Sequence, residues 1–247
     1  MLNSKTEALG IIFPNSYDAM VPELASERLM ASIPFASRYR MCDFILSSMV
    51  HSGIDNISII VRKNYHSLLD HLGAGREWDL VRKNGGLNIV PPFAQKQVKV
   101  FEGRIEALES LRGYLLKQPQ KYVIMTDANI AINFDFNELL DAHIKSGADV
   151  TMMYRKQEIP KAFIRQSRDR MDLYYALGMN GDRVSKIYIN PTEEALPAQA
   201  SSAPASPRCP GLCLPSSMPC SLRALTGAPA CGRLSRLSLA WPSTCPL

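Results

Sequence analysis

The sequence has no glycine between Phe13 and Phe35, directly after an apolar run at residues 9–13. A short apolar run of this kind predicts a buried strand. In an open α/β sheet, phosphates are commonly held by the loop after the first strand. That loop uses glycines because their backbone N–H groups can approach the oxygens closely. The missing glycines therefore argue against an ordinary phosphate cradle at residues 14–34.

Long apolar runs and metal-binding cysteine pairs are also missing. No stretch reaches the roughly 18 apolar residues that a membrane span needs, and the first ten residues do not resemble a signal peptide. Five of the six cysteines lie between Cys209 and Cys245, without a C-x-x-C spacing and far from every histidine. This pattern favours neither a zinc site nor a disulfide framework. We therefore expect a cytoplasmic protein that does not enter a membrane.

Acidic residues are absent from residue 197 onward, while four arginines lie there. Without these four, 24 Lys and Arg of the total 28 face 23 Asp and Glu, so the net charge of +5 belongs almost entirely to the tail. The body of the chain is nearly neutral. It therefore shows no basic surface of the kind that binds nucleic acid, and no nucleic-acid partner is expected.

The same tail lacks Lys, Asn, His, Ile, Val, Phe and Tyr. It consists mainly of Pro, Ser, Ala, Leu, Cys, Arg and Gly, so we expect it to be disordered and unable to extend a sheet. We place its start at residue 193 and the folded part at residues 5–192. Two interpretations remain open: a low-complexity tail, or translation in a shifted reading frame. The abrupt change of composition near residues 190–196 favours the shifted frame.

Strands and helices are expected to alternate along the folded part. The apolar patterns and glycine stops predict strands at 9–13, 57–61, 87–90, 122–126 and 149–154, and helices at 40–53, 65–72, 105–116 and 136–146. Asn180-Gly181 predicts a hairpin turn between 177–179 and 184–189. This alternation predicts an α/β fold with a mainly parallel, helix-covered sheet.

Several blocks then appear in a fixed order. Residues 33–53 read IPFASRYRMCDFILSSMVHSG, followed by WDL at 78–80, GGL at 85–87, IVPP at 89–92 and GRIEA at 103–107. They resemble the PFGGKYRLIDFPLSN, WDLxRxxGG, ILPP and GTAxA segments of the glucose-1-phosphate adenylyltransferase family. The resemblance covers about residues 5–190. It implies an incomplete, Rossmann-like nucleotidyltransferase domain with a mixed sheet, here without the left-handed β-helix domain of the family.

The first loop departs from that family. Its active members carry GGxGTRLxPLTxxRAKP there, whereas this chain has Phe13-Pro14 at the glycine pair, Arg28 at the later arginine and Met30 at the lysine. A methionine cannot neutralise a phosphate. The pattern resembles the GlgD-type, regulatory branch of the family. The resemblance implies a non-catalytic or weakly catalytic, C-terminally truncated subunit that pairs with a catalytic chain in glycogen biosynthesis.

The resemblance also implies a set of site residues. A pocket for ATP or glucose 1-phosphate would contain Asn15, Arg38, Gly103, Arg104 and Asp127, with Arg28 as the one candidate for catalysis. Asp127 ends an apolar strand and stands where the family holds its metal, so it is the candidate ligand for Mg²⁺, a cation that prefers carboxylate oxygens.

Simpler interpretations stay open beside these. Asp127 could cap its own turn, Arg38 could lie on a solvated face, and Asp43 could cap a helix. His71 follows an apolar stretch without a Cys or Ser partner in the sequence, which favours a structural role, and Cys42 is expected in the core. The whole chain could also be an active nucleotidyltransferase that uses Arg28, Arg38 and Asp127, or a fragment that folds poorly.

Overall fold

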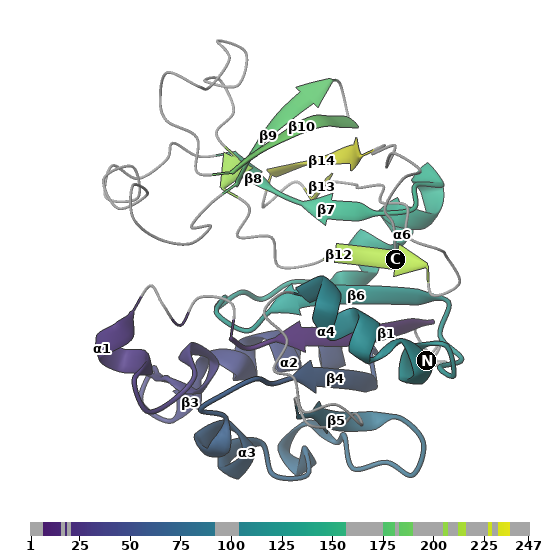
Figure 1. Cartoon of the computed structure of the whole chain (residues 1–247). Helices are drawn as coiled ribbons and strands as arrows, with labels where there is room; N and C mark the ends of the chain where they lie inside the picture. Colours follow the sequence, from purple (N-terminus) through teal and green to yellow (C-terminus); the bar gives the residue numbers. More distant parts are fainter. Residues whose placement is uncertain are drawn as a thin grey trace. The chain divides into compact units, whose positions relative to one another are not determined.

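The structure is a computed structural model. It describes residues 7–15, 18, 21–91, 104–156, 175–180 and 183–189, together with four short strands between residues 205 and 237. The chain forms two compact units, Met1–Asn137 and Glu138–Leu247. Figure 1 labels most of their helices and strands. The boundary predicted at residue 192 lies outside the described residues.

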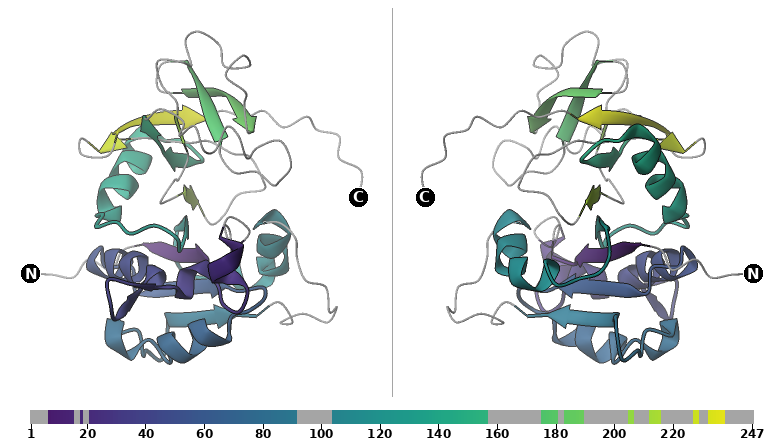
Figure 2. Two further views of the ribbon diagram at one scale, coloured as in Figure 1. Left: turned by 90° about the vertical axis from the view of Figure 1, so that its left-hand side faces the viewer. Right: turned by 90° about the vertical axis from the view of Figure 1, so that its right-hand side faces the viewer.

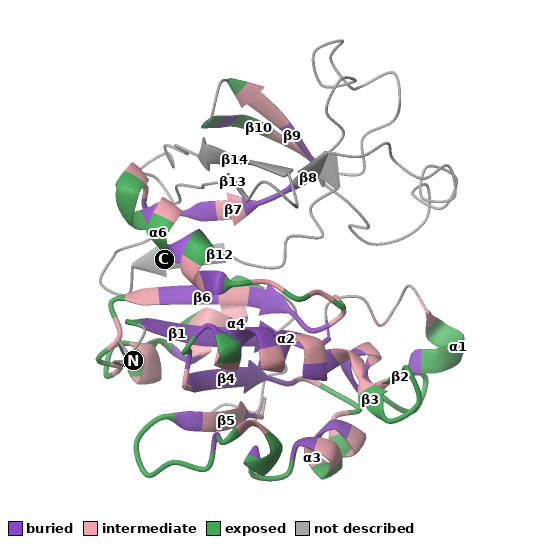
Figure 3. Cartoon of the chain, turned by 180° about the vertical axis from the view of Figure 1, so that it is seen from behind, coloured by how far each residue is buried: buried purple, intermediate pink, exposed green. Residues whose placement is uncertain are grey.

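The first unit contains a parallel sheet of four strands in the order β5-β4-β1-β6. These strands are β1 (Ala8–Phe13), β4 (Asn56–Ile60), β5 (Gly86–Val90) and β6 (Tyr122–Asp127). Every residue of β1 and β4 is buried (Figure 3), which explains why both read as nearly continuous apolar runs. The parallel, Rossmann-like sheet predicted from the sequence is confirmed.

Helices cover both faces of this sheet, with α2 on one face and α4 and α5 on the other (Figure 2). The helical segments of the unit are α1 (Pro22–Ala25), η2 (Met30–Ser32), α2 (Met41–His51), α3 (His66–Leu72), η3 (Arg76–Trp78), α4 (Arg104–Ser110) and α5 (Arg112–Leu115). A small hairpin of β2 (Pro34–Phe35) and β3 (Tyr39–Arg40) precedes α2.

Helix α2 begins and ends where its sequence predicts. The carboxylate of Asp43 accepts a hydrogen bond from the backbone N–H of Arg40, which satisfies a donor that the first turn leaves without a partner. After the helix, Gly53 has φ +77°, a conformation that favours glycine and ends the helix. Met49 of α2 is fully buried, and its sulfur lies 2.9 Å from the position that a Cβ would take at Gly10, so α2 packs directly against β1.

One predicted helix is in fact two. Instead of a single helix at 105–116, α4 ends at Ser110 and α5 begins at Arg112. The hydroxyl of Ser110 donates to the carbonyl of Ala107, and the N–H of Leu111 is shared between the carbonyls of Ala107 and Leu108. This local bonding competes with the regular helical ladder and tightens the turn. None of the helices among the described residues combines the length and apolarity that crossing a membrane requires.

The second unit contains a short strand and a hairpin around a small core. Its elements are most of α6 (Phe136–Ser146), β7 (Thr151–Met153), β8 (Arg155–Lys156), β9 (Tyr175–Asn180) and β10 (Arg183–Ile189). β9 and β10 pair antiparallel, which confirms the predicted hairpin, although its turn lies outside the described residues. Val150, Tyr154, Leu177 and Val184 pack together as the core.

The tail contributes four short strands to this unit: β11 (Ala205–Ser206), β12 (Leu212–Pro215), β13 (Gly227–Ala228) and β14 (Gly232–Leu237). β12 and β14 each pair antiparallel with β7, and β14 also pairs with β10. The expectation that the tail cannot extend a sheet is therefore wrong at these strands. The main-chain hydrogen bonds of a sheet can form without β-branched side chains. The preference of those side chains for strands depends on how they pack and is not a requirement for pairing. The rest of the tail lies outside the described residues.

Candidate functional site

The parallel sheet has one place where its strand order reverses. From β1 the chain passes to β4 and β5 on one side, and β6 then returns to the other side of β1. The last residues of β1 and β6, Phe13 and Asp127, are partners in the register. Ligands of open α/β sheets bind outside the carboxyl ends of the strands at such a switch point. The site is therefore expected where β1 and β6 end.

The side chain of Asn15, in the loop after β1, forms three hydrogen bonds within the chain. Its side-chain amide donates to Asp18 Oδ2 at 3.1 Å and to the carbonyl of Lys63 at 3.3 Å, and its Oδ1 accepts the N–H of Arg62 at 2.9 Å. Asn15 is 7% exposed. The side chain predicted to contact a nucleotide thus links the loop after β1 to the loop after β4.

Asp18 strengthens the same closure. While its Oδ2 accepts from Asn15, its Oδ1 accepts the backbone N–H of Met30 at 2.8 Å. Both carboxylate oxygens therefore bind groups of the chain itself. A phosphate cradle offers unpaired N–H groups to its ligand, whereas the N–H groups of Met30 and Arg62 are bonded to side chains.

Asp127 lies at the end of β6 and is bonded to Arg104, the first residue of α4. Arg104 Nη2 donates to both carboxylate oxygens at 2.8 Å, and the Asp127 side chain is 7% exposed while that of Arg104 is 54% exposed. The guanidinium carbon also lies 5.5 Å from the centre of the Phe13 ring. The structure thus brings together two predicted pocket residues, as an ion pair beside the last residue of β1.

A buried acceptor lies two residues further on. Asn129 Oδ1 is shielded from solvent and has no hydrogen-bond partner within the part of the chain that the structure describes. Leaving a buried amide oxygen unpaired is costly, so it is a place where a ligand donor would be favoured. Sequence reasoning missed Asn129, although its position just after Asp127 was a usable signal.

The remaining predicted residues are Arg28, Arg38 and Gly103. Arg28 and Arg38 are exposed, and the guanidinium of Arg38 lies 5.8 Å from the centre of its neighbouring Tyr39 ring. Gly103 lies outside the described residues. The structure therefore places Asn15, Arg104 and Asp127 around the switch point, and among the described residues neither Arg28 nor Arg38 forms a hydrogen bond or ion pair with them.

The test for Mg²⁺ gives a negative result at this edge. Asp127 is the predicted ligand, and both of its oxygens are bonded to a guanidinium. The carboxylate of Asp18 is likewise committed, to Asn15 and Met30. Mg²⁺ needs carboxylate oxygens at about 2.0–2.1 Å in a nearly octahedral arrangement. The arrangement of these residues does not fit that ion.

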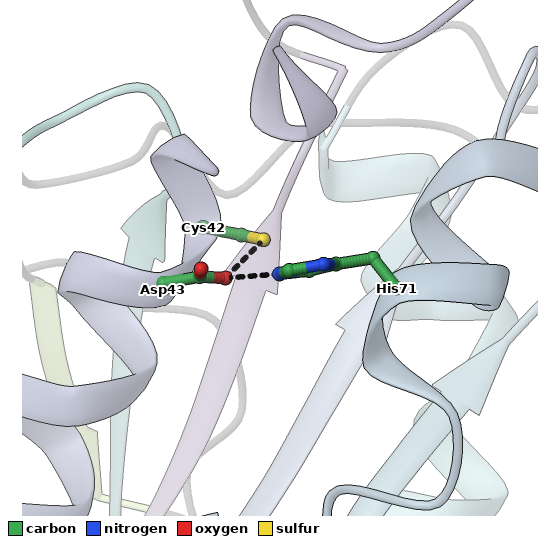
Figure 4. Close-up of side chains that lie close together, drawn as sticks. All are labelled: Cys42, Asp43 and His71. Carbon is green, nitrogen blue, oxygen red and sulfur yellow. Dashed lines mark hydrogen bonds and ion pairs between the residues drawn. The ribbon is translucent and has the colours of Figure 1, made fainter. Parts of the chain in front are cut away.

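A second cluster joins α2 and α3, and Figure 4 shows its three side chains. Asp43 Oδ1 accepts from the Cys42 thiol at 3.3 Å and lies 2.7 Å from His71 Nε2. The sequence did not reveal this contact, because 28 residues separate Asp43 from His71. The predicted capping role of Asp43 and the burial of Cys42 are confirmed, and the bond of His71 to Asp43 agrees with the structural role that the sequence favours for His71.

The Cys42, Asp43 and His71 ligand atoms lie within 4.8 Å of one another, a spacing that could hold a metal ion. Burial, with a smaller effect of the Asp43 carboxylate, raises the pKa of the Cys42 thiol far above its ordinary value. A metal ligand must be a thiolate, and Asp43 already accepts three hydrogen bonds from Arg40, Cys42 and His71. The hydrogen bonds of Asp43 are therefore formed within the chain, and the cluster acts as a clamp that connects α2 to α3.

The fold of the chain is that of a nucleotidyltransferase domain. A glucose-1-phosphate thymidylyltransferase structure from Bacillus anthracis superimposes with a TM-score of 0.60, covering 85% of this chain and 72% of that one at 14% identity. Residues 22–168 match the sequence profile of the family described as nucleotidyl transferase. Because this match spans more than half of the chain, the chain belongs to the nucleotidyl transferase family.

Within this family, the chain is similar to proteins of glycogen biosynthesis. The chain is 36% identical to the glycogen biosynthesis protein GlgD of Geobacillus stearothermophilus over 67% of its length, and 31% identical to GlgD of Bacillus subtilis over 77%. It is 29% identical over 60% to the glucose-1-phosphate adenylyltransferase of Bacillus mycoides. The resemblance inferred from the motif blocks is confirmed. The chain covers 48% and 55% of the two GlgD proteins, about half the length of these relatives.

Proposed function

We propose that this chain is a non-catalytic or weakly catalytic regulatory subunit of glucose-1-phosphate adenylyltransferase. That enzyme makes ADP-glucose and diphosphate from ATP and glucose 1-phosphate in glycogen biosynthesis. The proposal agrees with the names of the relatives, which include both GlgD and glucose-1-phosphate adenylyltransferase proteins. We expect it to act in the cytoplasm by pairing with a catalytic chain.

One observation carries the proposal: Asn15 and Asp18, the two polar residues that the structure describes in the loop after β1, are bonded to other segments of the chain. Asn15 ties the loop to Arg62 and Lys63, and Asp18 ties it to Met30. Phosphoryl transfer depends on positioning the phosphates and on cations that stabilise developing negative charge. Removing one such contact commonly costs about a hundredfold or more in rate. The backbone N–H groups of Met30 and Arg62 are bonded to Asp18 and Asn15 of this loop and are therefore not offered to a phosphate, so catalysis by this chain should be low.

Turnover and assembly test the proposal together. The purified 247-residue chain is incubated with ATP, glucose 1-phosphate and Mg²⁺, and ADP-glucose is measured by chromatography. We expect product at the level of the protein-free control. Co-expressed with a catalytic glucose-1-phosphate adenylyltransferase chain, it should elute with that chain in gel filtration and change its KM or effector response. Robust turnover by the chain alone would refute the proposal.

A second candidate is an active sugar-phosphate nucleotidyltransferase that holds phosphates differently. Asn129 Oδ1 favours it, because this buried acceptor has no hydrogen-bond partner among the described residues and could accept one from a ligand. Exposed Arg28 and Arg38 would then supply positive charge. A calorimetric titration with ATP separates the two: Mg²⁺-dependent binding that Asp127→Ala abolishes supports the second candidate, and absence of such binding supports the first.

A further inference from the structure

Arg104 occupies the electrostatic position that a metal ion would take. Asp127 is almost fully buried, and each of its two oxygens lies 2.8 Å from Arg104 Nη2. A buried carboxylate is stable as an anion only when it is paired, and the guanidinium provides that charge from within the chain.

The guanidinium is held from a second side. Its carbon lies 5.5 Å from the centre of the Phe13 ring, within the range of a favourable cation–π contact. Phe13 is the register partner of Asp127 across β1 and β6, so the sheet itself sets the distance between the two groups that hold Arg104. The ion pair is therefore part of the frame of the site, and more than a chance surface contact.

We propose that Arg104 is a resident cation that keeps divalent metal ions away from Asp127. A divalent ion bound to Asp127 would need the same oxygens and would bring its charge next to a guanidinium, so Arg104 would have to leave first. The inference rests on the proposed function and deepens it: ligands at this edge would bind without a metal ion.

Mn²⁺ is the probe, because free Mn²⁺ has an electron paramagnetic resonance signal that is lost on binding. The full chain is compared as wild type, Arg104→Gln and Asp127→Asn, together with Arg104→Gln/Asp127→Asn. Wild type and Asp127→Asn should bind Mn²⁺ equally weakly. Arg104→Gln should gain one site per chain with an affinity at least tenfold higher, and the double variant should lose it. Arg112→Gln, which removes an exposed arginine of neighbouring α5, is the matched control and should gain nothing.

Two results would overturn the inference. One is wild-type binding of Mn²⁺ that Asp127→Asn removes, and the other is a folded Arg104→Gln variant that gains no site. If circular dichroism shows that Arg104→Gln is unfolded, the comparison of wild type with Asp127→Asn decides alone: equal binding supports the inference and weaker binding in Asp127→Asn refutes it. The titration needs no partner and no turnover. Failure of the proposed function would appear as ADP-glucose formation by a chain that still excludes Mn²⁺.

Discussion

At the scale of single residues, three polar side chains form hydrogen bonds within the chain, and one of them, Asn15, was predicted from the sequence to contact a ligand. Asn15 and Asp18 bond to loops of the chain, and Asp43 bonds to the start of its own helix and to His71. Each is a polar group close to or within the core, where forming internal hydrogen bonds avoids a large desolvation cost. In a sequence, residue type alone does not distinguish such structural side chains from side chains that bind a ligand.

Asp43 should be important for stability. Asp43→Ala removes the acceptor for Arg40 N–H, the Cys42 thiol and His71, so we expect a loss of about 2–3 kcal/mol in the free energy of unfolding. Asp70→Ala is the control, because the Asp70 carboxylate is 69% exposed and forms an i,i+4 pair with His66 at 3.5 Å. Such surface pairs contribute about 0–1 kcal/mol. Urea unfolding of both variants measures the difference, and equal losses would contradict the clamp.

Cys42 should be protected from alkylation in the native protein. It is 1% exposed, and burial raises the pKa of its thiol, so almost no thiolate is present near neutral pH. We expect iodoacetamide to label Cys42 on the order of a hundredfold more slowly in buffer than in urea. Peptide mapping by mass spectrometry reads this cysteine separately from those in the tail. Equal labelling rates in the two solvents would show that the thiol is accessible.

At the scale of elements, a glycine allows β5 to begin close to the backbone of the preceding segment. The turn into β5 depends on Gly86, which has φ +83°, and a Cβ built there would lie 2.2 Å from the carbonyl oxygen of Leu80. No side chain can relieve a clash with backbone. Of the Gly85-Gly86 pair, which predicted a turn in the sequence, Gly86 is therefore required by both the positive φ and the close backbone, whereas Gly85 is required by its φ of +81°.

Gly86→Ala should destabilise the first unit by on the order of 2–4 kcal/mol, because both the clash and the left-handed conformation penalise a side chain. Gly113→Ala is the matched control within the same unit. Gly113 lies in α5, and apart from its chain neighbours and the backbone of its own helix no described atom lies within 4 Å of the position that a Cβ would take, so alanine should be neutral or stabilising by about 0.5–1 kcal/mol. Chemical denaturation compares the two. A harmless Gly86→Ala would show that the β5 turn differs from this structure.

His143 in α6 should make the second unit sensitive to acid. Burial lowers the pKa of His143 below its ordinary value, an effect that the negative charge of Asp149 partly opposes. The unfolded chain then binds a proton near pH 6.5, where the folded chain does not. Stability is therefore full above about pH 6.5 and falls as the pH drops toward the folded pKa, by at most about 1.4 kcal/mol per pH unit.

Thermal melts between pH 7.5 and 5.0 measure this dependence. His143→Gln keeps a group that can bond to Thr151, the present partner of His143 Nδ1, but it cannot titrate. The variant should lose less stability than the wild type over the same pH range, whatever its stability at pH 7.5. Identical slopes for the two proteins would assign the acid sensitivity to other groups.

At the scale of the whole molecule, the tail matters because its strands β12 and β14 pair with β7. β7 is three residues long and pairs with β12 on one edge and with β14 on the other. Removing residues 197–247 would leave both edges without partners, and unpaired strand edges promote aggregation. We expect this truncated chain to melt at a lower temperature and to scatter more light than the full chain.

A shorter deletion is the control for this prediction. Removal of residues 238–247 leaves all fourteen strands of the described residues in place, and it should change neither the melt nor the scattering. Equal behaviour of the full chain and the chain that ends at residue 196 would contradict the pairing. That result would instead support the interpretation of the tail as disordered or out of frame.

Much of the architecture could be predicted because its causes are local. Continuous apolar runs predicted β1, β4 and β6, and glycines after α2, α3 and α6 predicted where these helices end, at Gly53, Gly73 and Gly147. The break at Ser110 was missed because a hydroxyl–carbonyl bond leaves no periodic signal. The contact between Asp43 and His71 was missed because it depends on how α2 and α3 pack.

By itself, the sequence determined the class of fold, the family and the absence of a glycine-rich cradle after β1. These follow from periodicity, motif order and residue type, which are properties of neighbouring residues. Only the tertiary structure decided that Asn15 closes its own loop and that Arg104 neutralises Asp127. Such pairings join segments 23 to 48 residues apart, and the chain has to fold before their distances and burial exist.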